Sequence, residues 1–94
     1  MTFKSKRKQK DFQLRRNFNI SIEEYEEMLK NQQNCCAICW IHISHLKKKL
    51  AVDHCHKTNK IRGLLCQSCN VGLGQFEDSG SLLRAAADYS DKYK

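Results

Sequence analysis

The sequence contains no proline, no visible internal repeat and no apolar run long enough to span a membrane, which excludes repeat arrays and transmembrane helices. Residues 4–8 are basic, but no apolar segment follows them, so we expect no secretory signal peptide. A length of 94 residues predicts one small domain. The hydrophobic core of such a domain is marginal, and a cross-link or a metal ion usually supports it.

Acidic residues are outnumbered by basic ones, 10 against 17, and the formal net charge is +7. The excess lies in residues 1–16 and 47–62 and predicts a nucleic-acid partner, with a solvated, solubilising surface as the alternative. We interpret residues 1–16 as a basic flexible arm or a frayed helix and residues 17–94 as the folded domain. The side chains expected to contact phosphates are Lys4, Lys6, Arg7, Lys8, Lys10, Arg15, Arg16, Lys57, Lys60 and Arg62.

Two Cys-x-x-Cys pairs, Cys36 with Cys39 and Cys66 with Cys69, stand out among the six cysteines. In an intracellular chain, whose thiols stay reduced, paired motifs of this kind predict metal ligands rather than disulfides. Four thiolates close a tetrahedron around Zn²⁺ and leave no position for water, which predicts a structural role. Such an ion could supply much of the folding free energy of a small chain.

The cysteine pattern leaves alternatives open. Cys35 could replace Cys36 with a shift of one residue, although the spacing favours Cys36. His42 and His45 could instead complete a separate Cys₂His₂ site with the first pair. We interpret the remaining cysteine, Cys55, as a packed thiol.

The apolar and capping patterns predict an α+β fold. A helix should begin near Ser21, which forms a capping box with Glu24, while Ile20 packs onto Tyr25. Residues 50–53 and 61–65 predict two short strands joined by a turn, and residues 69–76 a short helix. Residues 81–93 predict a last helix. Its apolar stripe, which we expect to face the core, consists of Leu82, Ala86, Tyr89 and Tyr93.

An Asp-His-x-His segment at Asp53, His54 and His56 is followed, directly after the second Cys-x-x-Cys, by Asn70. A carboxylate and an amide oxygen suit a hard cation such as Mg²⁺, and an imidazole can take a proton from water. Together these groups can hydrolyse a phosphodiester. Strict alternation along a strand would point Asp53 and His54 to opposite faces, so the strand must break or twist between them.

Four runs of sequence resemble the recombination endonuclease VII family, a branch of the HNH, or His-Me finger, nucleases, over about residues 20–89. They are SIEEYEEML from Ser21, CAIC from Cys36, VDHCH from Val52 and IRGLLCQSCNVGLG from Ile61. The resemblance implies a zinc-stapled ββα-metal domain with flanking helices. It also implies a divalent-metal-dependent DNA endonuclease whose products carry 5′ phosphates and 3′ hydroxyls.

The resemblance also implies a role for each matching residue. Asp53 and Asn70 are similar to the family's ligands for Mg²⁺ or Mn²⁺, His54 to its general base and His56 to a phosphate contact. The two cysteine pairs correspond to its structural zinc ligands. The substrate is expected to be duplex or branched DNA, in the cytoplasm of a phage-infected or prophage-bearing bacterial cell. Monomer and homodimer both remain open, and the alternative function is a non-catalytic zinc module that binds nucleic acid.

Overall fold

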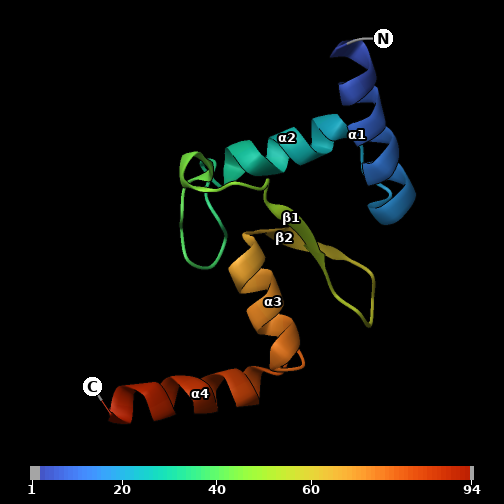
Figure 1. Ribbon diagram of the computed structural model, residues 1–94. Helices are drawn as coiled ribbons and strands as arrows, with labels where there is room; N and C mark the ends of the chain where they lie inside the picture. The colour runs from blue at the N-terminus through green and yellow to red at the C-terminus, as the bar shows by residue number, and fades with distance from the viewer. Residues whose placement is uncertain (1–2, 94) are drawn as a thin grey trace.

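The computed structural model describes residues 3–93 and the side chains of residues 7–93, and it confirms the α+β fold (Figure 1). Helices flank a two-stranded antiparallel sheet, and the chain extends over 54 × 31 × 22 Å. Within the described residues, no helix has the length and apolar character needed to cross a bilayer. The elements are α1 (Phe3–Phe18), α2 (Ile22–Asn31), the 3₁₀ turn η1 (Ile43–His45), β1 (Ala51–His54), β2 (Ile61–Leu65), α3 (Gln67–Gln75) and α4 (Gly80–Lys92).

Helix α2 begins as the sequence predicts. The Ser21 hydroxyl accepts a hydrogen bond from the Glu24 N–H at 3.0 Å, and the Glu24 carboxylate accepts one from the Ser21 N–H at 2.8 Å, which confirms the capping box. Ile20 and Tyr25 are both buried and belong to the same core cluster. The Tyr25 hydroxyl donates to the Leu50 carbonyl at 2.6 Å, so α2 is fixed to the residue that leads into β1.

Helix α1 occupies the segment for which the sequence left a flexible arm or a frayed helix open, and it continues past the predicted boundary at residue 16. Tertiary contacts explain why so polar a segment is helical. Leu14 is buried in the core, and the Asp11 carboxylate accepts a hydrogen bond from the Ile22 N–H at 2.8 Å. That N–H, followed by the Arg15 guanidinium, lowers the pKa of the Asp11 carboxyl. Helix α1 is thereby docked on the start of α2.

The hairpin of β1 and β2 contains the irregularity that the sequence required. Asp53 pairs with Gly63 and His54 pairs with Ile61, so Arg62 is an extra residue on β2 between the two pairs. A bulge of this kind increases the local twist and redirects side chains. The register shift falls opposite the step from Asp53 to His54, where the sequence required an irregularity, but the extra residue belongs to β2 and β1 continues through both residues.

The predicted packing of the last helix is wrong. Helix α4 has the expected position in the sequence, but none of its residues, all of which the structure describes, is buried. The backbone takes left-handed values at Glu77 and Asp78, with φ of 57° and 55°, where α3 gives way to α4. After this turn α4 extends away from the sheet (Figure 1), and Leu82 and Tyr89 remain 45% and 71% exposed.

Candidate metal centre and active-site cleft

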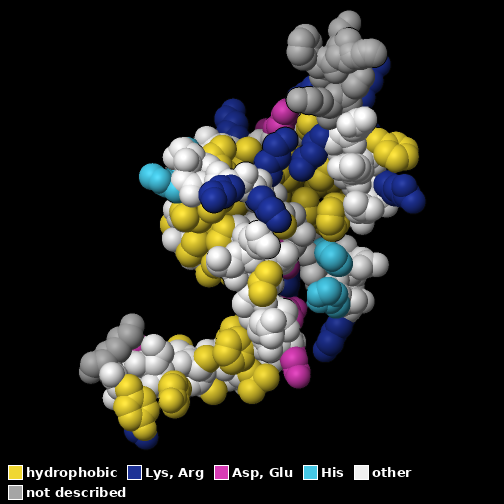
Figure 2. Space-filling model, viewed as in Figure 1, with side chains coloured by type: hydrophobic (Ala, Val, Ile, Leu, Met, Phe, Trp, Pro, Cys, Tyr) yellow, Lys and Arg dark blue, Asp and Glu magenta, His cyan; other side chains and the backbone are white. Residues whose placement is uncertain are grey.

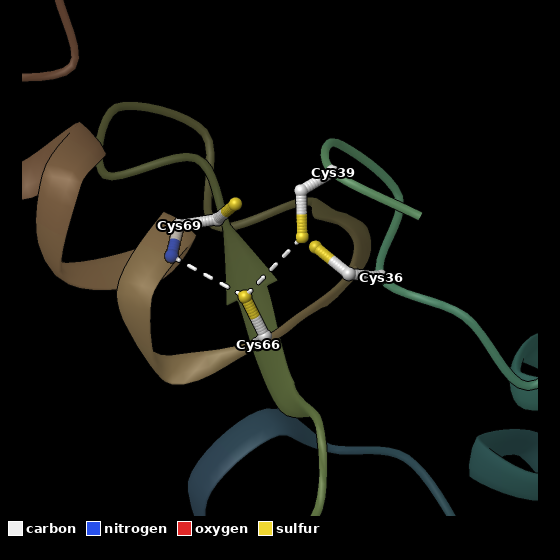
Figure 3. A group of neighbouring side chains, drawn as sticks. All are labelled: Cys36, Cys39, Cys66 and Cys69. Carbon is white, nitrogen blue, oxygen red and sulfur yellow. Dashed lines mark hydrogen bonds between the residues drawn. The ribbon is translucent and has the colours of Figure 1, made fainter. Parts of the chain in front are cut away.

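The four cysteines of the two Cys-x-x-Cys pairs converge on one point (Figure 3). Cys36 and Cys39 lie in the loop after α2, and Cys66 and Cys69 lie at the junction of β2 and α3. Their sulfur atoms all lie within 4.8 Å of one another, and among the described residues this is the group of three or more Cys, His, Asp or Glu side chains close enough to hold a metal ion. The cluster can therefore hold zinc, which would join two segments that are distant in the sequence.

The chemistry of the cluster fits a cation. The backbone N–H groups of Ile38 and Cys69 donate to the sulfurs of Cys36 and Cys66 at 3.4 and 3.5 Å, an arrangement that stabilises thiolates. Burial opposes ionisation of Cys36, but backbone donors outweigh it and lower the pKa of its thiol to about 6. Burial and the neighbouring sulfurs raise the pKa of the Cys69 thiol. So many sulfurs at such short range can all ionise only with a positive charge between them.

Of the ligand sets that the sequence left open, the structure brings together the two Cys-x-x-Cys pairs. Cys35 lies outside the cluster, and its thiol contacts the Gln33 carbonyl at 3.3 Å. His42 uses Nδ1 to accept from the Ser44 N–H at 3.1 Å and caps η1, so it belongs to a local turn. Cys55 is only half-buried, in the turn between the strands, where bonds to Thr58 lower the pKa of its thiol.

A second feature is a cleft of about 480 Å³ between α1, β1 and α3. It is lined by all of the residues predicted to be catalytic: Asp53, His54, His56 and Asn70. The wall from α1 consists of Lys10, Leu14 and Phe18, which are spaced four residues apart and so share one face of the helix. The structure thus brings the strand end and the helix of the predicted site to one hollow.

Aromatic contacts determine how the histidines of the cleft lie. The ring centroids of His54 and His56 are 5.1 Å apart and their planes are tilted by 54°. On its other side, the His54 ring lies 5.7 Å from the ring of Phe18 in α1. Figure 2 shows two adjacent histidine side chains beside the hairpin, on the face of the molecule where Lys and Arg side chains also gather. Helix α1 therefore limits how the His54 imidazole can rotate.

The Asp53 carboxylate is already engaged by a positive charge. It accepts from Nε of Arg62 at 2.7 Å and from Nη2 at 3.1 Å, and its side chain is 13% exposed. The same guanidinium also contacts Asp78, in the turn before α4. Arg62, which the sequence predicts to contact nucleic acid, is thus held between two carboxylates in this structure.

The predicted nucleic-acid contacts lie in different surroundings. Arg7 and Arg15 form ion pairs with Glu26 and Asp11, and the side chains of Lys4 and Lys6 lie outside the described part. Four others have exposed positions, namely Lys8, Arg16, Lys57 and Lys60. Lys10 is half-buried, with its Nζ 4.9 Å from the centre of the Tyr25 ring. It lines both the cleft and a neighbouring hollow of about 320 Å³ whose rim includes Lys47, Lys48 and Lys49.

Three residues in or next to the cleft were not identified as part of the site from the sequence. Phe18 and Leu14 form its helical wall, but two apolar residues in a basic segment form too sparse a pattern to reveal a buried face. Asp78 is linked to the site by its hydrogen bonds with Arg62, which lies 16 positions earlier in the sequence. No local sequence pattern indicates such a contact.

Comparison with known proteins identifies relatives of this chain. A family model described as recombination endonuclease VII matches residues 11–92. The Gene 59 protein of Mycobacterium phage D29 is 41% identical over 76 residues, which are 80% of this chain and 46% of that protein. The Gene 59 protein of Mycobacterium phage L5 is 38% identical over 73 residues, 77% of this chain and 44% of that protein. The chain thus spans less than half the length of these relatives, and no solved structure matches it significantly.

Proposed function

The chain belongs to the recombination endonuclease VII family, and from this premise we propose that it is an endonuclease of the HNH, or His-Me finger, type that hydrolyses phosphodiester bonds in DNA. The observation that carries the proposal is the shared cleft, because Asp53, His54, His56 and Asn70 line one hollow beside a cysteine cluster able to hold zinc. A carboxylate, two imidazoles and a carboxamide in one place form a hydrolytic set that a simple binding module does not need.

Asp53 and Asn70 are proposed to hold Mg²⁺ or Mn²⁺. Their oxygens are the donors that hard cations prefer, and the Asp53 carboxylate, which is largely shielded from solvent, already binds the positively charged guanidinium of Arg62. When bound, the divalent ion supplies polarisation of the scissile phosphate and neutralisation of the leaving oxygen. Asn70 lies one residue after Cys69, so the cysteine cluster fixes the part of α3 that presents it.

His54 is proposed to be the general base that takes a proton from the attacking water. Its position supports this role, because the imidazole and the Asp53 carboxylate line the same cleft. The contact with Phe18 orients the ring before substrate arrives. His56, whose ring lies against that of His54, is proposed to contact the phosphate.

The zinc-containing protein is expected to nick supercoiled plasmid only when Mg²⁺ or Mn²⁺ is present, and a chelator that removes these ions but leaves the zinc in place should stop the reaction. A four-way junction, a linear duplex and an RNA hairpin, tested side by side, identify the substrate class. Metal-independent DNA binding without cleavage of any of the substrates would contradict the proposal and favour a non-catalytic zinc module.

The DNA path is proposed to run from the cleft across Lys10 to the lysines at 47–49. Burial and the charge of Lys49 both lower the pKa of Lys10, which reflects how closely the two lie. The cleft and the lysine-rimmed hollow share Lys10, Tyr25 and Leu50 in their linings, so a phosphate backbone leaving the cleft meets these lysines next. Contacts of this kind add affinity without reading sequence.

Replacing Lys47 and Lys49 by glutamine should therefore weaken DNA binding and reduce its salt dependence. Each lost phosphate contact lowers the slope of log affinity against log salt by about 0.9, or about 2 for the pair. The measurement is fluorescence anisotropy with a labelled duplex over a range of salt concentrations. The matched control is Arg84→Gln with Lys92→Gln in α4, which removes the same charge far from the cleft (Figure 1). Equal losses in the two variants would contradict the proposed path.

A further inference from the structure

We propose that Arg62 is a positioning residue that changes partners when a divalent cation enters the cleft. In the metal-free protein Arg62 holds the Asp53 carboxylate in place. When a cation binds, Arg62 loses its hydrogen bonds to Asp53 and keeps those to Asp78. This inference rests on the proposed function, because it takes Asp53 to be a ligand of the cation. It assigns a role to Asp78, a residue outside the cleft.

The contacts of Arg62 show both partners engaged at the same time. Nε donates to Asp53 Oδ2 at 2.7 Å and Nη2 to Asp53 Oδ1 at 3.1 Å. Nη1 donates to Asp78 Oδ2 at 3.0 Å and Nη2 to Asp78 Oδ1 at 3.2 Å. Each carboxylate is bound through two nitrogens, which is the strongest geometry that arginine offers. Nε serves Asp53 alone, and Nη1 serves Asp78 alone.

Two backbone irregularities produce this arrangement. Arg62 is the bulged residue of β2, opposite the step from Asp53 to His54, and the bulge redirects its side chain toward Asp53. Asp78 has a left-handed backbone, with φ of 55°, and its N–H donates to the Leu73 carbonyl at 2.7 Å. Aspartate tolerates this conformation better than most residues. The turn after α3 thus presents Asp78 to the guanidinium.

Charge explains why a second carboxylate is needed. A divalent cation and a guanidinium both seek the oxygens of Asp53, and they repel each other at that short range. If Asp53 were the sole partner of Arg62, whose side chain is 37% exposed, cation binding would leave the guanidinium beside the cation with no carboxylate to offset their repulsion, at an energetic cost. Asp78 removes this cost because the guanidinium keeps two hydrogen bonds after Asp53 is released. Asp78 should therefore strengthen cation binding without touching the cation.

The contacts of individual nitrogens provide a direct test by nuclear magnetic resonance. On titration of the zinc-loaded protein with Mg²⁺, the Arg62 Nε–H signal should move upfield as its bond to Asp53 is lost. The Nη signals should keep the slow exchange of a bound guanidinium because Asp78 still holds them. An Nε–H signal that stays unchanged while Asp53 and Asn70 respond to Mg²⁺ would overturn the switch but leave the ion site intact. If Asp53 and Asn70 do not respond either, the proposed function fails and the switch fails with it.

A mutant cycle tests the same idea by affinity. Mn²⁺ binding, followed by electron paramagnetic resonance on the zinc-loaded protein, should be weakened about tenfold by Asp78→Asn, an effect typical of coupled neighbours. Arg62→Gln should tighten binding, because it removes the competitor of the cation. In the Arg62→Gln background, Asp78→Asn should have almost no effect. An equal loss in both backgrounds would mean that Asp78 acts only through its charge and would overturn the proposal. Thermal unfolding of each variant verifies that it is folded.

Discussion

Replacing Cys66 by serine is expected to unfold the domain. Cys66 is 4% exposed, directly follows β2, and caps α3 because its sulfur accepts a hydrogen bond from the Cys69 N–H. Serine caps helices as well as cysteine does here, so the substitution keeps the cap and removes one of the four sulfurs able to hold zinc. Structural zinc contributes about 10–16 kcal/mol in small zinc domains, which is comparable with or larger than the roughly 5–15 kcal/mol net stability of a typical domain. Cys66→Ser should therefore lose cooperative thermal unfolding.

The control for this experiment comes from the cysteines outside the cluster. Cys35→Ser and Cys55→Ser should retain bound zinc, the helical circular dichroism and the unfolding transition, because neither sulfur belongs to the group that converges. Exhaustive removal of zinc from the unmutated protein should reproduce the spectrum of Cys66→Ser. A Cys66→Ser protein that stays folded at the original melting temperature would show that the core alone sustains the fold.

The second large effect is expected from His54→Ala, which should lower the rate of DNA cleavage by about 10²- to 10⁴-fold, the usual contribution of a general base. DNA affinity and Mn²⁺ affinity should change little, because the imidazole is proposed to act on water rather than on the cation. The measurement is single-turnover cleavage at saturating protein and Mg²⁺, which separates the chemical step from binding.

His42→Ala is the matched control for His54→Ala. His42 is exposed and caps η1, away from the residues that line the cleft. Its variant should cut DNA at the original rate. A folded His54→Ala protein that cuts as fast as the His42→Ala control would show that His54 is not the general base. His56→Ala would then test whether the neighbouring imidazole is the base instead.

Much of this fold can be predicted from the sequence, because the residues that determine it lie close together in the chain. The capping box at Ser21 and Glu24 predicts the start of α2, since both partners lie within one turn of helix. The spacing of each Cys-x-x-Cys pair predicts a metal-binding turn, and the alternation of side chains at Asp53 and His54 predicts an irregularity at that step, where the pairing register shifts. In each case, residues a few positions apart contain the necessary information.

Packing between distant segments could not be predicted from the sequence, because the residues that determine it lie far apart in the chain. Helix α1 has few apolar residues, and its helical state depends on the burial of Leu14 and on the bond from Asp11 to Ile22. The stripe on α4 has the pattern of a core face, yet no element covers it within the described residues, because the left-handed turn at Glu77 directs the helix away. A periodic pattern predicts that a face is apolar but not that another element lies opposite it.

The sequence by itself determined which chemical groups this protein has: four thiols able to hold a zinc ion, the carboxylate, imidazoles and amide of the proposed catalytic site, and basic segments near them. Only the tertiary structure decided how these groups are controlled. It positioned Phe18 against His54, joined Lys10 to the lysines at 47–49, and placed Arg62 between Asp53 and Asp78. Chemical identity belongs to single residues, whereas these contacts join segments whose proximity arises only when the whole chain packs.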